Sequence, residues 1–192
     1  QNGSEFLICP NPGCYAKKIK LFTHFVSRDA LNIDGLSEAT LEKFINEGWL
    51  HDLCDIFNLA EHKEEIETMD GFGKKSYQNL IQAIEEDNDA ALERVVYSLG
   101  IKGIGLSMAK LICKTYPVRL SEMENLTPEE LTDIDGIGEK LAESFCEFFQ
   151  RGENRELGKK LEQILRITMP EQNISTQLEG AVFVITGSLK HF

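Results

Sequence analysis

Four copies of one short sequence pattern carry the chemistry that this chain suggests first. The pattern is apolar-x-Gly-apolar-Gly, and its copies lie at residues 33–37, 69–73, 101–105 and 134–138, with serine replacing the last glycine in the first copy. The central glycines are 36, 32 and 33 residues apart. Glycine accepts a positive φ, which costs other residues steric energy. Because ordinary connectors have no reason to repeat, this spacing predicts an array of small supersecondary units built around tight turns.

The chemistry expected of these turns is anion binding. Each copy separates two segments with helical periodicity, so its last residue would begin a helix whose first N–H groups have no partner within the helix. Those donors, together with the positive end of the helix dipole, bind phosphate. Several phosphate sites along one protein predict contact with a nucleic-acid backbone, without preference for base sequence. The alternative is that the turns only connect packed helices.

Charged neighbours make the four turns unequal. Acidic residues around the fourth turn, Asp135, Glu139 and Glu143, outnumber Lys140, so we expect weaker binding there. In the first turn Ser37 could cap the following helix, which leaves scaffold and phosphate binding both open. The candidate phosphate-binding residues are Gly71, Gly73, Lys74 and Lys75 in the second turn, Lys102, Gly103, Gly105 and Lys110 in the third, Gly136 and Gly138 in the fourth, and Gly35 in the first.

A second candidate site involves cysteine. Cys9 and Cys14 flank a turn-rich Pro-Asn-Pro-Gly stretch, and this spacing is typical of one half of a structural zinc site. Such zinc takes four ligands, and the chain has no second close cysteine pair, so the sequence predicts a half-site only. Cys54, Cys113 and Cys146 lie far apart on apolar helical faces and are interpreted as buried thiols.

Composition sets limits on the partners. The chain has 192 residues, 42% of them hydrophobic, and no apolar run long enough to span a membrane. Residues 1–8 do not resemble a signal peptide, so we expect a cytoplasmic protein that does not bind membranes. The net charge of −12 is unusual for a nucleic-acid binder, but residues 6–28 and 95–119 contain lysine and arginine without any Asp or Glu. Local charge decides such contacts because distant surface charges are screened.

Helices are expected to position the turns. Periodicity predicts helices near residues 16–27, from Ser37 to before Gly48, after Gly73, and over 90–99, 105–115 and 154–165. Thr127 and Glu130 form a predicted capping box, and an apolar face follows over 141–149. Residues 181–187 have the composition of a β-strand. The predicted fold class is therefore mainly α, a tandem helix-hairpin-helix array with four hairpins, a small N-terminal Cys knuckle and a truncated C-terminal strand.

The order of these parts resembles the C-terminal half of bacterial NAD-dependent DNA ligases. The resemblance rests on residues 9–14 (CPNPGC), 24–30 (HFVSRDA), 33–36 (IDGL), 71–76 (GFGKKS) and 99–101 (LGI), and on residues 178–189 (LEGAVFVITGSL), which look like the start of a BRCT domain. It implies four parts: the second half of a four-cysteine zinc knuckle over 1–15, a helix-hairpin-helix domain over 16–167, a linker over 168–177 and a truncated BRCT domain over 178–192.

The resemblance also implies a function. The chain would clamp nicked double-stranded DNA through its backbone, in replication and repair, beside the upstream catalytic domains of the same protein. The family's Lys-x-Asp-Gly motif is absent, so no activity is expected of this chain alone. NAD and magnesium would serve the parent enzyme and not bind here, and zinc would bind at the half-site only. Two alternatives stay open: a tandem helix-hairpin-helix module of another repair protein, and a helical protein-interaction domain, which the acidic charge favours.

Overall fold

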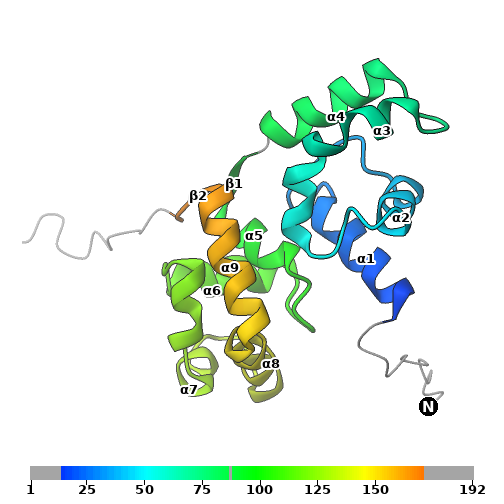
Figure 1. Ribbon diagram of the computed structural model, residues 1–192. Coiled ribbons are helices and arrows are strands. Elements are labelled where there is room, and N and C mark those ends of the chain that lie inside the picture. Colours follow the sequence, from blue (N-terminus) through cyan, green and yellow to red (C-terminus); the bar gives the residue numbers. More distant parts are fainter. Residues whose placement is uncertain (1–13, 87, 171–192) are drawn as a thin grey trace, which may run out of the picture.

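The computed structural model describes residues 14–86 and 88–170, and these residues are mainly helical (Figure 1). The predicted fold class is confirmed for this part of the chain. Cys9, residues 1–13 of the predicted knuckle and the predicted strand at 181–187 lie outside the described residues. The elements in chain order are α1 (Tyr15–Val26), α2 (Glu38–Asn46), the 3-10 helix η1 (Leu53–His62), α3 (Lys63–Thr68), α4 (Lys74–Glu86), β1 (Asp89–Ala91), α5 (Leu92–Ser98), α6 (Leu106–Thr115), the 3-10 helix η2 (Leu120–Asn125), α7 (Pro128–Thr132), α8 (Glu139–Gln150), α9 (Gly152–Ile164) and β2 (Arg166–Thr168).

Local sequence signals explain most of these boundaries. The Ser37 side chain accepts a hydrogen bond from the Thr40 backbone and caps α2, as predicted. Thr127 and Glu130 form the predicted capping box at the start of α7. The 3-10 helix η1, which the sequence pattern did not reveal, begins with a reciprocal capping box between Asp52 and Asp55.

Two short strands correct the sequence-based boundaries. The helix expected over 90–99 begins only at Leu92, because residues 89–91 form β1 and pair in parallel with β2. Thr168, expected to begin a linker, pairs with Ala91 in this sheet. Neither strand was predicted, since three residues are too few for a period-2 pattern to stand out. The parallel pair ties together the two ends of the α5–α9 region.

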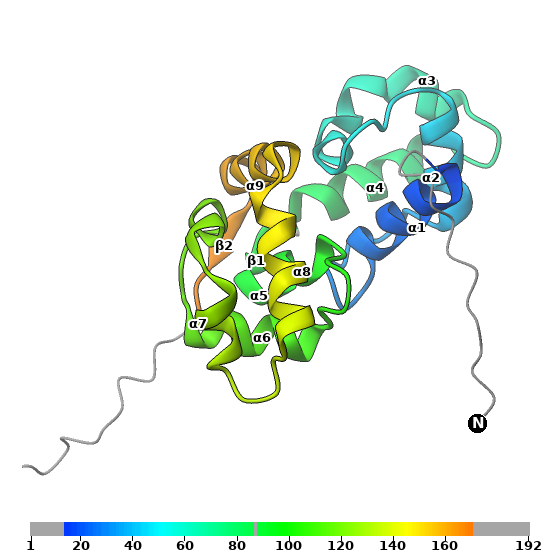
Figure 2. The ribbon, with the colours of Figure 1, turned by 90° about the horizontal axis from the view of Figure 1, so that it is seen from below.

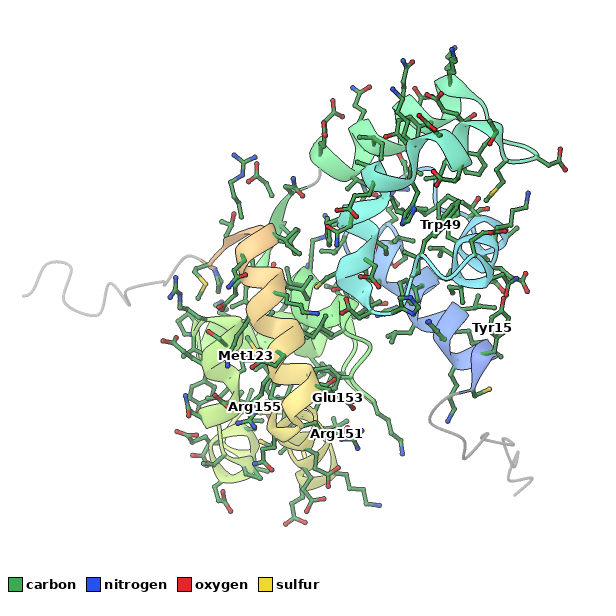
Figure 3. All side chains as sticks on the ribbon, viewed as in Figure 1. Tyr15, Trp49, Met123, Arg151, Glu153 and Arg155 are labelled. Atoms are coloured by element: carbon green, nitrogen blue, oxygen red, sulfur yellow. The ribbon has the colours of Figure 1, made fainter. Side chains whose placement is uncertain are left out.

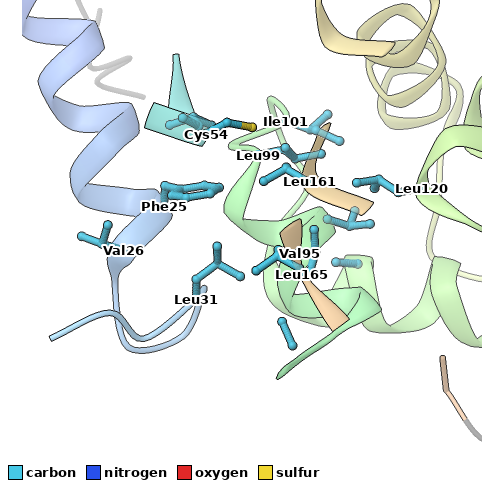
Figure 4. Close-up of a cluster of buried hydrophobic side chains, with 14 of the residues drawn as sticks. Phe25, Val26, Leu31, Cys54, Val95, Leu99, Ile101, Leu120, Leu161 and Leu165 are labelled. Atoms are coloured by element: carbon cyan, nitrogen blue, oxygen red, sulfur yellow. The ribbon is translucent and has the colours of Figure 1, made fainter. Parts of the chain in front are cut away.

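The helices form two halves that pack side by side. Elements α1–α4 make up one half and α5–α9 the other, in both views of the ribbon (Figures 1 and 2). A continuous hydrophobic cluster runs through both. Figure 4 shows Phe25 of α1, Cys54 of η1, Leu99 of the segment after α5 and Leu161 of α9 in this cluster. Because full burial of one such apolar side chain contributes about 1.5–3 kcal/mol, the shared core holds the halves together.

Polar contacts fix how the halves meet. Arg94 of α5 donates from Nε to the Ala30 carbonyl at 2.7 Å and from Nη2 to the Arg28 carbonyl at 2.6 Å. The Nε2 atom of His24 on α1 lies 2.7 Å from the Tyr97 carbonyl oxygen. These bonds join α5 to α1 and to the loop that follows α1. The position of α1 against the second half is therefore set by directional bonds as well as by apolar packing.

The two Arg94 bonds yield a stability prediction. Arg94→Met should lower the free energy of unfolding by about 2 kcal/mol, because a charged donor to two backbone carbonyls is removed. Arg155 of α9, labelled in Figure 3, forms an ion pair of 2.8 Å with Glu124 in which both side chains remain accessible to solvent. Arg155→Met is the matched control and should cost less than about 1 kcal/mol. Urea unfolding measures both, and equal losses would contradict the joining role of Arg94.

Candidate nucleic-acid interface

All four sequence patterns form tight turns with glycine in the left-handed backbone region. Gly35, Gly71, Gly103 and Gly136 have φ of 90°, 86°, 80° and 91°. In the last three turns, the fourth residue's N–H donates to the first residue's carbonyl over 2.9, 3.0 and 3.0 Å. A turn of this kind with positive φ at its third residue favours glycine there. The predicted reason for the glycines is thus confirmed.

Apolar residues on both sides anchor each turn. Ile101 and Ile104 are buried on either side of the third turn, and the same holds for the first and fourth turns, whereas the central glycines are exposed. Met69 and Phe72, which flank the second turn, are half-buried and pack against the core. The backbone at every central glycine therefore lies at the surface on a rigid support.

The third and fourth turns pack on one another's helices. Leu141 of α8 lies so close to Gly103 that a Cβ there would be 2.6 Å from its Cδ2 atom. Reciprocally, Met108 of α6 is the nearest neighbour of Gly136, at 3.9 Å from a Cβ placed there. A side chain at Gly103 would be strained by the positive φ and would also require the end of the Leu141 side chain to shift. Each turn is held by the helix that follows the other turn.

The first and second turns are paired in the same manner. Leu80 of α4 lies 3.5 Å from the position that a Cβ on Gly35 would take. Lys43 of α2 donates from Nζ to the carbonyl of Asp70 at 2.7 Å, and its Nζ is 3.8 Å from a Cβ placed on Gly71. The four turns thus form two pairs, an arrangement that the spacing along the sequence did not specify.

Lys43 is a candidate site residue that sequence reasoning missed. It is exposed and brings a positive charge to the second turn from a helix that follows the first turn. In the second half, Ser144 of α8 occupies the equivalent place and donates to the carbonyl of Lys102 at 2.8 Å. Lys43 and Ser144 both lie eight residues after the central glycine of their own turn. The common role of Lys43 and Ser144 becomes visible only once the pairing of the turns is known, and no local sequence pattern indicates that pairing.

The helices that follow the turns differ in whether a side chain caps their first backbone N–H groups. Gly105 and Gly138 are the N-caps of α6 and α8 and offer no side chain to the first backbone N–H groups. Ser37 in contrast accepts from the N–H of Thr40 at 3.2 Å. One donor at the start of α2 is therefore already satisfied. Of the two roles left open for the first turn, the geometry favours scaffold.

The helices that follow the turns also differ in whether their first helical turn contains an acidic residue. Glu38 stands in the first turn of α2 and Glu139 in that of α8, where each occupies the position that an anion would be drawn to by the helix dipole. Neither α4 nor α6 has an acid in its first turn, and α4 begins with Lys74 and Lys75. The helices after the second and third turns thus begin without an acid, although Asp70 lies exposed within the second turn.

The remaining predicted lysine is placed less closely. Lys110 is exposed on α6 and lines neither of the two grooves that border Gly103. Lys140 of α8, in contrast, lines one of these grooves together with Lys102, beside Glu143. The structure therefore brings Lys102 to the third turn and leaves Lys110 on the helix surface beyond it.

The cysteines do not form a metal centre in the part of the chain that the structure describes. Cys14 is half-buried at the N-cap of α1, and its predicted partner Cys9 lies outside that part. Within residues 14–86 and 88–170, no three potential ligands gather. Burial raises the pKa of Cys54 and of Cys113 to about 12 and also raises that of Cys146. All three side chains are buried, so their interpretation as buried thiols is confirmed.

The Ser37 cap predicts how the first turn responds to mutation. Ser37→Ala should lower the free energy of unfolding by about 1 kcal/mol, whereas Ser37→Gly should cost only a few tenths, because glycine is tolerated at N-caps. Ser37→Gly also restores the pattern of the other three turns. Urea unfolding of both variants measures the difference. Equal losses, or none for alanine, would show that the cap contributes nothing.

No helix within residues 14–86 and 88–170 has the length and apolar character needed to cross a bilayer.

Comparison with known proteins agrees with the geometry of the turns. A family model described as helix-hairpin-helix motif matches residues 94–157, which contain the third and fourth turns with their helices. The chain is 49% identical over 190 residues to a DNA ligase of Lachnoclostridium phytofermentans, with 97% of this chain and 29% of that protein covered. It is 42% identical to a DNA ligase of Ruminiclostridium cellulolyticum (100% and 29% covered) and 38% identical to one of Fusobacterium nucleatum (100% and 28%).

The chain spans less than a third of the length of these relatives. The matches confirm the resemblance to DNA ligases that the motifs indicated. Together with the helix-hairpin-helix turns, they identify the chain as homologous, over its whole length, to a segment of bacterial DNA ligases.

Proposed function

We propose that this chain is the DNA-backbone-binding part of an NAD-dependent DNA ligase, and that it clamps nicked duplex DNA during nick sealing in replication and repair. The observation that carries the proposal is the exposed second and third turns, whose following helices begin without an acid. The homology to DNA ligases adds the functional context. The contact is made to phosphate, so it carries no base preference.

The second and third turns would each hold one phosphate. Backbone N–H groups at the start of α4 and α6 donate to the phosphate oxygens, and the helix dipole adds a favourable field. Lys74, Lys75 and Lys43 add positive charge at the second turn, and Lys102 does so at the third. At the fourth turn Gly136 and Gly138 present the same backbone, but Asp135 and Glu139 reduce its attraction for an anion.

Catalysis would belong to other parts of the enzyme. The chain contains no Lys-x-Asp-Gly motif, so it lacks the lysine that takes AMP from NAD in the family it resembles. NAD and magnesium would act in those catalytic domains. A helical protein-interaction domain is the second candidate function, and the net charge of −12 favours it.

Glycine N-caps allow a test that leaves the fold intact. A side chain at Gly73, Gly105 or Gly138 would meet nothing within 4 Å. Gly105→Asp should place a carboxylate on the donors meant for phosphate while capping α6 well, so stability should hold and DNA affinity should fall roughly tenfold or more. Gly73→Asp should have the same effects on stability and DNA affinity at the start of α4. Fluorescence anisotropy with a nicked duplex measures the affinity.

Two controls complete this test. Gly138→Asp makes the same change at the acidic fourth turn and should weaken DNA binding by less than about threefold. Gly105→Asn also caps α6 but adds no charge, so it separates the effect of the cap from that of the carboxylate. For the unchanged protein, log K should fall with log salt by about 0.9 per phosphate neutralised. Absence of duplex binding at low salt would refute the clamp, and equal, negligible effects of all three aspartates would favour simple connectors.

We also propose that Cys9 and Cys14 supply two of the four ligands of a structural zinc. The described residues do not complete such a site, so two further ligands must come from elsewhere in the protein. A form extended upstream of residue 1 should hold one zinc per chain by elemental analysis, and Cys14→Ser in that form should lose it. Zinc content that is unaffected by this substitution would exclude Cys14 as a ligand.

A further inference from the structure

Two acid-free stretches that are distant in sequence meet in the fold. Helix α1, which lies within the acid-free stretch 6–28, packs against the segment that leads into the third turn, which lies within the acid-free stretch 95–119. Leu21 lies 3.0 Å from the place of a Cβ on Gly100, and the rings of His24 and Tyr97 meet edge to face at 4.5 Å between centroids. Together with the His24–Tyr97 hydrogen bond, these contacts fix α1 beside the third turn.

A groove of about 440 Å³ opens between α1 and the third turn. Lys17, Lys20 and His24 line it from α1, and Lys102 and Gly103 line it from the turn. Among the described residues that line this groove there is no Asp or Glu. We call it the α1 groove. The two acid-free stretches thus produce one positive surface, although the protein as a whole is strongly acidic.

The other side of the third turn is different. A second groove, lined by Lys102 and Gly103 as well, contains Glu143 and Glu147 of α8. The α8 side thus carries Glu143 and Glu147 against Lys102 and Lys140, whereas the α1 side carries lysines without an acid, so an anion held at the third turn is attracted more strongly on the α1 side. At such short range, charges near the surface act with little screening. A phosphate backbone that leaves the third turn is steered into the α1 groove.

The first turn of α1 lacks the acidic residues that usually stabilise a helix start, and this lack agrees with the positive α1 groove. Acidic side chains stabilise the first turn of a helix, but the first turn of α1 contains Lys17 and Lys18 and no acid. Among the described α-helices only α4 and α6, which follow the two favoured phosphate-binding turns, share this lack of acid. Departures from local preference are expected at functional sites. A bound phosphate would bring a negative charge to the first turn of α1, where the described residues of the helix include no acid.

We propose that Lys17 and Lys20 extend the phosphate site of the third turn into a continuous contact with one strand of duplex DNA. Residues three apart lie on one face of a helix, about 4.5 Å along its axis. Consecutive phosphates of one strand follow each other every ~3.4 Å of the duplex axis. Both lysines are exposed, so each neutralises a phosphate next to the one held at Gly103 and Gly105. This inference rests on the proposed DNA-clamping function.

The test compares lysines of one helix. Lys20→Gln and the double variant Lys17→Gln/Lys20→Gln remove charge from the α1 groove. Lys18→Gln removes the same charge from the same helix, but Lys18 does not line the α1 groove. It lines a different groove with Asp52, Glu153 and Glu156, which Lys17 borders as well, and lies 6.0 Å from the Phe22 ring centroid. Affinity for a nicked duplex is measured by anisotropy over a range of salt concentrations, and thermal melting checks the fold of each variant.

The expected result is a stepwise fall in salt dependence. The slope of log K against log salt should decrease by about 0.9 for Lys20→Gln and by about twice that for the double variant, while Lys18→Gln leaves it unchanged. If Gly105→Asp abolishes binding but Lys20→Gln behaves as Lys18→Gln does, the clamp stands and the α1 contact is overturned. If the unchanged protein fails to bind duplex at low salt, the clamping function fails first. If the double variant loses an acidic protein partner but keeps DNA binding with an unchanged slope, the groove serves that partner and the proposal is wrong.

Discussion

The rest of the structure depends on one constraint, the tight turn with positive φ whose apolar neighbours are held by the core. Because φ is positive, the central residue is glycine, and the backbone beside it carries no side chain. Because the flanking residues of the first, third and fourth turns are buried, this bare backbone is also rigid. A helix that begins directly after such a turn presents its unsatisfied N–H groups at a fixed place. Each turn also contacts the helix that follows its partner turn.

Charge decides what this repeated geometry can do. The same backbone geometry appears four times. Helices α2 and α8 have an acid in their first turn, Glu38 and Glu139, whereas α4 and α6 have none. A protein with a net charge of −12 can thus contain restricted positive surfaces, because exposed charges interact mainly over a Debye length of about 8 Å. The fold brings α1 beside the third turn and enlarges one of these surfaces. Under the proposed function, acidic residues elsewhere would limit DNA binding to the turns whose helix starts carry no acid.

Local signals in the sequence predicted much of the fold. Glycine spacing, the Ser37 cap and the Thr127–Glu130 capping box are features of neighbouring residues, so the helices and turns that they set were foreseen. The 3-10 helix η1 was not, because ten residues with a capping box at Asp52 do not show the period of an α-helix. Strands β1 and β2 were missed as well, since their pairing joins Ala91 to Thr168 across the whole second half. The turns were predicted as the candidate site, and the structure forms them, but the places of Lys43 and of the α1 groove depend on contacts between distant segments.

The central claim is that backbone amides at the start of α4 and α6 bind DNA phosphate and those at the start of α2 do not. It is tested most directly by amide NMR spectra of the chain during titration with a short nicked duplex. The account predicts that the largest shift changes fall on the amides of residues 73–76 and 105–108, with little change over residues 38–40. Changes of similar size at all the helix starts, or confined to surfaces away from the turns, would contradict it.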